Sequence, residues 1–350
     1  MLKIGLIGCG GIAPAHIWAY QHIDDVKVVA LCDLNIDKAN SLASKFRIEN
    51  TYQNYWDMIE SNDLDSIDIC TPIPTHVQIV CDIAKAVPAL FLEKPMALTV
   101  SECDEIIKTL EKYGTKCCIN HLQLYSPLVQ KMDTLIKKNE FNLFSLKLTQ
   151  KESYEYLNSI GLAAQWNVSE KHGGIIWEVC SHLGYLQLHF LPDIKEVYAL
   201  GGKTKYEAYD NFSVFLKTSD DRFGIIELNW ISKETEVVYE FTEVNGKRIK
   251  IFFWENFVSE HTINPPQTVS NVMNNIITDE LRFFKKWSSF GTGYLRKFKL
   301  SPMYNIIREY ILSLKSEHPI PVPPEDGRKL IKLLECIKKS LNTKNPVKIE

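Results

Sequence analysis

The first 120 residues constrain the fold more than any other part of the chain, because short apolar runs alternate there with segments of helical periodicity. Five of the apolar runs are expected to be strands, at residues 2–8, 26–33, 66–71, 89–93 and 116–120. Uninterrupted apolar strands with helices between them are typical of a parallel sheet covered by helices on both faces. We therefore predict an α/β chain that opens with a doubly wound parallel sheet.

A glycine-rich turn joins the first of these strands to the first helix. In IGLIGCGGIAPAH, Gly8, Gly10 and Ala13 form a G-x-G-x-x-A pattern. Small residues at these positions permit a tight turn, close approach of a pyrophosphate to the backbone, and close packing of helix on strand. The helix N-terminus offers N–H groups and a positive dipole end to the phosphates. The pattern predicts a Rossmann dinucleotide site that includes Gly11 and Ile12.

The end of the second strand indicates which dinucleotide is bound. Asp33 follows Ala13 by about 20 residues, where an acid contacts the adenosine ribose in such folds. A carboxylate there accepts hydrogen bonds from both ribose hydroxyls and repels a 2′-phosphate, and Lys38 is the one cation close by in DLNID and its flank. We predict NAD as the cofactor and regard NADP as the less favoured one. A packing turn without a nucleotide is the alternative.

An acid and a histidine stand four positions apart in the apolar stretch IWEVCSHLG, residues 176–184. On one helix, Glu178 and His182 would lie on the same face, one turn apart. They could form a helix-surface pair, a core histidine satisfied by its neighbour, or a catalytic acid/base with its helper. A metal site is not expected, because the chain contains no CxxC, HExxH or HxH.

The pattern changes after about residue 140, where longer alternating runs follow one another. Asn245-Gly246 separates two of these runs and predicts a hairpin, because both residues tolerate positive φ in its turn. We expect an α+β domain with an open-faced, mainly antiparallel sheet and helices on one side. The predicted domains are residues 1–121 and 122–350.

Several motifs together resemble the glucose–fructose oxidoreductase / inositol dehydrogenase / MocA (Gfo/Idh/MocA) family over essentially the whole chain. They are GCGGIA in the first turn, CTPIPTH at 70–76, FLEKPMAL at 91–98, and HGGIIWEVCSHLGYL at 172–186. The resemblance implies a Rossmann domain, an open-faced second domain and a nicotinamide-dependent oxidoreductase. The Glu-Lys-Pro motif is the most specific of these pieces.

The resemblance also implies a catalytic group made of Lys94, Glu178 and His182. The sequence departs from the family pattern because Glu178 replaces the usual Asp, Cys180 replaces a frequent Gly, and NHLQLYSP lacks an arginine. Our hypothesis is that His182 accepts the proton of a substrate hydroxyl while Lys94 stabilises the developing alkoxide. Glu178 would hold His182 or a neighbouring hydroxyl.

The remaining candidate residues fall into two groups. Residues at the carboxyl ends of strands, where the cofactor crevice of an open parallel sheet lies, are expected to contact the cofactor: Thr71, Pro72, His76, Glu93, Lys94 and Asn120. Substrate contacts are expected from Lys94, Trp166, His172, Glu178 and His182. His76 could instead be a helix-cap residue, and Trp166 could belong to the core.

Composition bears on partners and compartment. A net charge of −3 gives no indication of a nucleic-acid partner, and membrane contact is not expected because no apolar stretch is long enough to span a bilayer. The nine cysteines are scattered, and the chain opens directly with a strand-like run, so we expect buried thiols in the cytoplasm. Residues 280–300 mix basic and aromatic side chains; an amphipathic helix and loop is favoured over a diphosphate site or a membrane-surface segment.

These inferences predict an NAD-dependent dehydrogenase or reductase acting on a secondary alcohol of a sugar, sugar-nucleotide or cyclitol. Two alternatives stay open: a redox glycosidase that retains its NAD, and a non-catalytic NAD-binding sensor. An uncovered sheet face commonly pairs with a second subunit, so a homodimer or homotetramer is expected.

Overall fold

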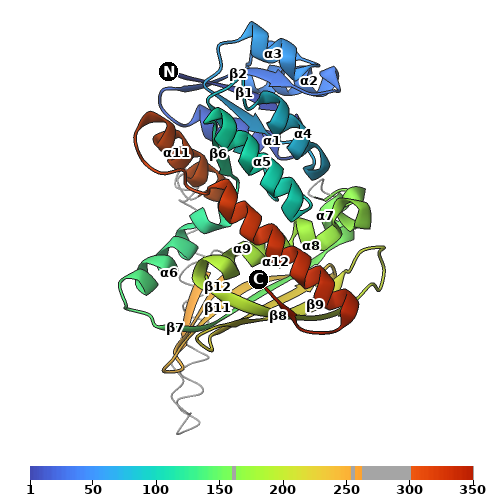
Figure 1. The fold of residues 1–350 in the computed structure, drawn as a ribbon, viewed down its shortest axis with the longest axis vertical. Coiled ribbons are helices and arrows are strands. Elements are labelled where there is room, and N and C mark those ends of the chain that lie inside the picture. Colours follow the sequence, from blue (N-terminus) through green and yellow to red (C-terminus); the bar gives the residue numbers. More distant parts are fainter. Residues whose placement is uncertain (160–162, 254–256, 262–300, 350) are drawn as a thin grey trace, which may run out of the picture.

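A computed structural model describes residues 1–159, 163–253, 257–261 and 301–349 (Figure 1). The basic and aromatic segment 280–300 lies outside these residues, so its three interpretations stay predictions. Within the described ranges, none of the helices combines the length and apolar character required to cross a membrane.

The N-terminal domain is built on a sheet of six parallel strands in the order β3-β2-β1-β4-β5-β6. This is the doubly wound order whose direction reverses between β1 and β4, so the prediction of a Rossmann sheet is confirmed. The strands are β1 (Leu2–Ile7), β2 (Val26–Cys32), β3 (Asn50–Tyr52), β4 (Ser66–Ile69), β5 (Ala89–Leu92) and β6 (Lys116–Ile119).

Helices connect these strands and cover the sheet. They are α1 (Ala13–Gln21), α2 (Ile36–Phe46), α3 (Tyr55–Ser61), α4 (His76–Ile83) and α5 (Val100–Tyr113), with the 3₁₀ turn η1 (Ile73–Thr75) before α4. Local sequence sets the ends of α5: Thr99 and Glu102 form a capping box, and Gly114 ends the helix in the left-handed conformation.

The second domain is built on an eight-stranded sheet in the order β13-β12-β11-β7-β10-β9-β8-β14. All neighbouring strands are antiparallel except β7 and β10, which are parallel. This confirms the prediction of a mainly antiparallel sheet. The strands are β7 (Leu143–Ser153), β8 (Ile194–Gly202), β9 (Asn211–Thr218), β10 (Phe223–Asn229), β11 (Ile231–Glu243), β12 (Arg248–Phe252), β13 (Phe257–His261) and β14 (Val347–Lys348).

The predicted hairpin at Asn245-Gly246 joins β11 to β12, but its turn differs from the expected one. Only Gly246 has positive φ, at 88°, and its N–H donates to Glu243 O at 2.8 Å. A turn over Val244 and Asn245 followed by a left-handed glycine makes the longer hairpin loop with a bulge. The expectation of positive φ at both residues was therefore wrong.

The helices of the second half of the chain are α6 (Pro127–Lys137), α7 (Tyr154–Ser159), α8 (Gly174–Glu178), α9 (Cys180–Phe190), α11 (Pro302–Lys315) and α12 (Pro324–Thr343), with the 3₁₀ turns η2 (Leu122–Tyr125), η3 (Gln165–Val168) and η4 (Glu170–His172). Of these helices, α8, α9 and α12 lie between the two sheets (Figure 1). On α9, the Gln187 amide donates to Leu146 O and Ile225 O, both at 3.0 Å, and so ties the helix to β7 and β10.

The last two helices connect the domains. The long helix α12 crosses from one sheet to the other and contacts α5 and β6 as well as α9 and β8 (Figure 1). Helix α11 packs against α1, and its buried Tyr310 hydroxyl lies 2.7 Å from the Ser66 hydroxyl on β4. The N–H of Ile119, the last residue of β6, donates to Val322 O just before α12 at 2.9 Å, so α12 is anchored at the carboxyl end of β6.

Candidate active site at the junction of the two domains

The glycine-rich turn after β1 has the geometry that a dinucleotide needs. Gly8 has φ +97°, and a Cβ atom there would lie 2.7 Å from Cys70 O, so only glycine fits. Gly10, Gly11 and Ile12 are exposed, and a Cβ on Gly10 would point into open space. Helix α1 then begins at the buried Ala13. The turn therefore leaves room for a pyrophosphate at a helix N-terminus.

Asp33 is half-buried and tied to this turn. Its two carboxylate oxygens accept the N–H groups of Cys9 and Asn35, each at 2.8 Å. A carboxylate has about four acceptor positions, so capacity for ribose hydroxyls remains. Asp33 thus fixes the end of β2 relative to the glycine-rich turn, a role that the sequence pattern did not indicate.

The loop after β4 places the next candidates at the same edge of the sheet. His76 is completely buried at the start of α4, with its ring nitrogens 2.8 Å from Thr71 O and 3.3 Å from Met96 O. Burial lowers the pKa of His76, so the ring is neutral and its single N–H donates to one of these two carbonyl oxygens. It connects the Thr71-Pro72 loop, in which Pro72 is exposed, to the turn that follows β5.

Three buried charged side chains, His16, Asp68 and Glu93, form a hydrogen-bonded network beneath the carboxyl edge of the parallel sheet. Burial acts to lower the pKa of His16, but the Asp68 carboxylate outweighs this effect and the pKa lies well above its usual range. His16 is therefore an imidazolium that donates to Asp68 Oδ2 and Glu93 Oε1, both at 2.8 Å. Burial acts to raise the pKa of Glu93, yet its hydrogen bond with His16 lowers it.

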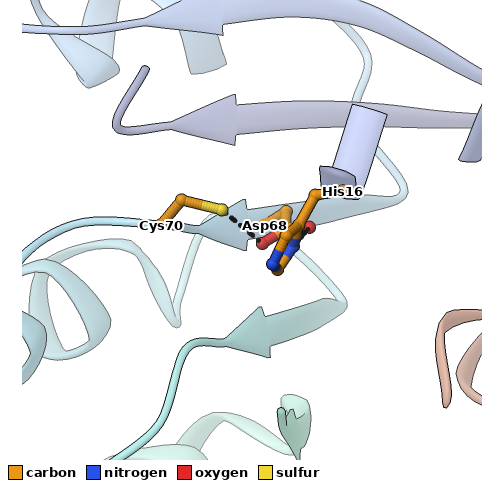
Figure 2. A group of neighbouring side chains, drawn as sticks. All are labelled: His16, Asp68 and Cys70. Carbon is orange, nitrogen blue, oxygen red and sulfur yellow. Dashed lines mark hydrogen bonds and ion pairs between the residues drawn. The ribbon is translucent and has the colours of Figure 1, made fainter. Parts of the chain in front are cut away.

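Figure 2 shows His16 of α1 against Asp68 on β4, with Cys70 on the other side of Asp68. One ligand atom of each of these three residues lies within 4.8 Å of the others, a spacing that could hold a metal ion. The Cys70 thiol donates to Asp68 Oδ1 at 3.3 Å, and burial, followed by the Asp68 charge, raises its pKa well above the usual range. Hydrogen bonds from the His16 ring and the Cys70 thiol to the Asp68 carboxylate thus hold these three side chains together.

The same network of buried hydrogen bonds extends through Glu93 to the predicted catalytic residue Lys94. Asn120, at the end of β6, donates from Nδ2 to Glu93 Oε1 at 2.5 Å, while Glu93 Oε2 accepts the backbone N–H of Lys94 at 3.1 Å. The peptide bond between Lys94 and Pro95 is cis. Asn120 Oδ1 is buried without a hydrogen-bond partner among the described residues, so it can accept a hydrogen bond from a bound nicotinamide amide.

The lysine side chain crosses from one domain to the other. Lys94 Nζ donates to Glu178 O at 2.8 Å and to Glu178 Oε1 at 3.1 Å, and the side chain of Lys94 is only 9% exposed. The structure thus brings Lys94 and Glu178 together, although they are 84 residues apart in the chain. A buried ammonium beside a carboxylate can stabilise an oxygen anion at this junction.

The acid–histidine segment is not one continuous helix. It divides at Val179 (φ −102°, ψ −45°) into α8, which ends with Glu178, and α9, which holds His182. Among the described residues, the Glu178 carboxylate pairs with Lys94 and not with His182. Burial, followed by the Lys94 charge, lowers the pKa of His182 well below its usual range. His182 is therefore neutral and able to accept a proton.

The sequence analysis missed His121, which directly follows Asn120. Its ring is 2% exposed and stacks on Tyr185 of α9, with ring centroids 3.7 Å apart and planes 5° apart. Burial, followed by the Lys94 charge, lowers the pKa of His121 to about 3. The one sequence feature that could have identified His121 as a site residue is its position just after a strand of the parallel sheet.

Two predicted substrate residues are not linked to this junction by a described contact. His172 is half-buried in η4, at the turn that precedes α8. The backbone of Trp166 lies in η3, but its side chain lies outside the described part. Their roles stay predictions.

Comparison with known proteins identifies the family to which both domains are similar. The sequence profile described as "Oxidoreductase family, NAD-binding Rossmann fold" (GFO_IDH_MocA) matches residues 2–121. The profile described as "GFO/IDH/MocA C-terminal domain" matches residues 149–252. Together the two matches span more than half of the chain.

Individual relatives match over the full length. The chain is 24% identical to a myo-inositol 2-dehydrogenase of Thermotoga maritima, with 100% of this chain and 99% of the relative covered. Its fold is similar to the WlbA dehydrogenase of Bordetella pertussis in complex with NADH and UDP-GlcNAcA, at 17% identity, TM-score 0.80, and coverage of 100% and 99%. It is also similar to scyllo-inositol dehydrogenase of Lactobacillus casei with NAD(H) and scyllo-inositol, at 15% identity, TM-score 0.78, and the same coverage.

Proposed function

Since the chain belongs to the Gfo/Idh/MocA family of NAD-binding oxidoreductases, we propose that it oxidises a secondary alcohol of a polyhydroxylated substrate at the junction of its two domains. The observation that carries this proposal is the contact of Lys94 with Glu178, which precedes the neutral His182 by four residues. This contact puts a cation and a carboxylate at the carboxyl edge of the parallel sheet, where an open α/β sheet binds its ligands.

The residues that would hold NAD lie along this edge in the order of the cofactor's parts. Asp33 would accept the adenosine ribose hydroxyls, and the turn of Gly8, Gly10, Gly11, Ile12 and Ala13 would bind the pyrophosphate. Thr71, Pro72, His76, Glu93, Lys94 and Asn120 would surround the nicotinamide half. The free amide oxygen of Asn120 and the open space at Gly10 both fit this assignment.

The protein's own part in the reaction is to handle a proton and a developing charge. NAD, when bound, would supply the hydride acceptor for the reaction. His182, which is neutral, accepts the hydroxyl proton, and Lys94 stabilises negative charge on the oxygen in a largely buried environment. Glu178 holds the Lys94 ammonium in place, the role that its hydrogen bond supports in preference to holding His182.

We propose a sugar, sugar-nucleotide or cyclitol as the substrate. The relatives named above include dehydrogenases of inositols and one bound to a sugar nucleotide. Buried polar side chains at the junction match hydroxyl-rich molecules, since each hydroxyl both donates and accepts a hydrogen bond. Trp166 and His172 are proposed as further parts of this substrate site.

The proposal is tested by following NADH formation with NAD and a panel of cyclitols, sugars and sugar nucleotides, with NADP in parallel. Turnover of one class with NAD supports the proposed function. Binding of NAD without turnover of any panel member contradicts it and favours a sensor. Cofactor that co-purifies with the protein and cleavage of a glycosidic bond without net NADH would instead identify a redox glycosidase.

Assembly and compartment are part of the same proposal. On the face of the second sheet away from α9, Phe215 and Phe223 are 47% and 37% exposed, which favours burial against a second copy in a homodimer or homotetramer. Light scattering of wild type and Phe215→Lys tests this. All nine cysteines are free and eight are buried, which fits a reducing compartment such as the cytoplasm.

A further inference from the structure

His121, which directly follows Asn120 at the end of β6, is a buried imidazole. Both ring nitrogens are buried and have no hydrogen-bond partner among the described residues. A buried polar atom without a partner destabilises the folded state, and native proteins contain few of them. Asn120 Oδ1, in the preceding residue, is a third such atom. Three unpartnered polar atoms therefore lie in two consecutive residues at the end of β6.

The surroundings of His121 are those of the proposed active site. Its ring lies flat against Tyr185, which is three residues after His182 on α9 and so on the same face of that helix. The preceding Asn120 binds Glu93, the neighbour of Lys94. Burial, followed by the Lys94 charge, lowers the pKa of both His121 and His182. The contacts with Tyr185 and Glu93 thus connect residues 120 and 121 to the helix that carries His182 and to the neighbour of Lys94.

We propose that the imidazole of His121 is a specificity-determining residue whose two ring nitrogens bind two well-separated hydroxyl groups of the substrate. A neutral imidazole has one N–H donor and one acceptor nitrogen, while a hydroxyl can serve as either. Because its two nitrogens point in diverging directions, the ring can accept from one hydroxyl and donate to another on the far side of the ring, while the stacked Tyr185 ring fixes its plane. This inference rests on the proposed function and adds to it the part of the substrate that is recognised.

The substitution His121→Phe separates a binding role from a packing role. Phenylalanine keeps the aromatic stack on Tyr185 and removes both ring nitrogens. If His121 binds substrate, the KM for the best panel substrate should rise by roughly 10- to 100-fold, as expected for two lost hydrogen bonds. The dissociation constant of NAD should stay unchanged, and the melting temperature should be equal or higher, because two unsatisfied buried atoms are gone.

A matched substrate and a second variant sharpen the test. For a substrate analogue that lacks one of the two hydroxyls, wild type and His121→Phe should differ less in KM than for the parent substrate. His121→Gln retains a donor and an acceptor and should recover part of the loss. It also replaces His121→Phe if that variant does not fold.

The experiments distinguish a failure of the inference about His121 from a failure of the proposed function. An unchanged KM in His121→Phe, with an active wild type, overturns the role of His121 and leaves the proposed function intact. Wild-type protein that binds NAD but turns over no polyol overturns the proposed function, and the inference about His121 with it.

Discussion

The buried network of His16, Asp68 and Glu93 gives the sharpest prediction on stability, through the substitution Asp68→Asn. Asp68 and His16 are both fully buried, and Asp68 Oδ2 accepts from His16 at 2.8 Å. Asparagine keeps the shape of the side chain and removes its charge. His16 then retains a single carboxylate partner, Glu93, and its pKa should fall toward the ordinary value.

The expected loss in the free energy of unfolding has two sources: the broken Asp68–His16 pair and the linkage of folding to protonation of His16. Removing one member of a buried charged pair costs roughly 3–5 kcal/mol of the free energy of unfolding. Because the pKa of His16 is raised in the folded state, this stabilisation is complete below the unfolded value of about 6.5 and decreases as the pH rises toward the folded pKa. The decrease is about 1.4 kcal/mol per pH unit, so it amounts to up to about 2 kcal/mol between about pH 6.5 and 8.

Urea unfolding followed by circular dichroism at these two pH values measures the effect. The destabilisation by Asp68→Asn should be larger at about pH 6.5 than at about pH 8. Asp65→Asn is the control, since Asp65 precedes the same strand at its opposite end and accepts the Lys3 N–H at 2.7 Å. Equal destabilisation by Asp68→Asn at both pH values, or a larger loss at the higher pH, would refute an imidazolium at His16.

Two further predictions concern the reaction. Because burial and then the Lys94 charge lower the pKa of His182, the rate of alcohol oxidation should stay constant from about pH 8 down to about pH 6.5. A loss of rate centred near pH 6.5 would contradict a low pKa. Asp33→Asn should reduce the preference for NAD over NADP by roughly ten-fold, because the carboxylate no longer repels the 2′-phosphate. An unchanged ratio of the two kcat/KM values would exclude Asp33 from the ribose site.

The sequence predicted the fold wherever periodicity was strong. The predicted strand 26–33 is β2, Val26–Cys32, and the glycine turn and Asp33 lie where the pattern required. Strand β3 escaped prediction because its three residues, Asn50–Tyr52, are too few and too polar to show a period. Helix α3 next to it was missed as well.

The site was predicted less completely because its contacts are long-range. Lys94 and Glu178 were both named, but the partner of Glu178 depends on how the two domains meet, and the sequence pattern favoured His182. Asp68 stands inside an apolar strand, and an acid in a fully buried strand is itself a signal of a buried partner. Its partner His16 is 52 residues away in the chain, so only the fold could identify it.

The central claim, that the Lys94–Glu178 junction is the catalytic site, is tested most directly by comparing Lys94→Met with wild type on the best panel substrate. NADH formation gives kcat and KM, and a separate titration gives the affinity for NAD. The account predicts a fall in kcat of roughly 10²- to 10³-fold or more with NAD binding retained. A near-normal kcat in Lys94→Met would show that the chemistry takes place without this lysine and would contradict the account.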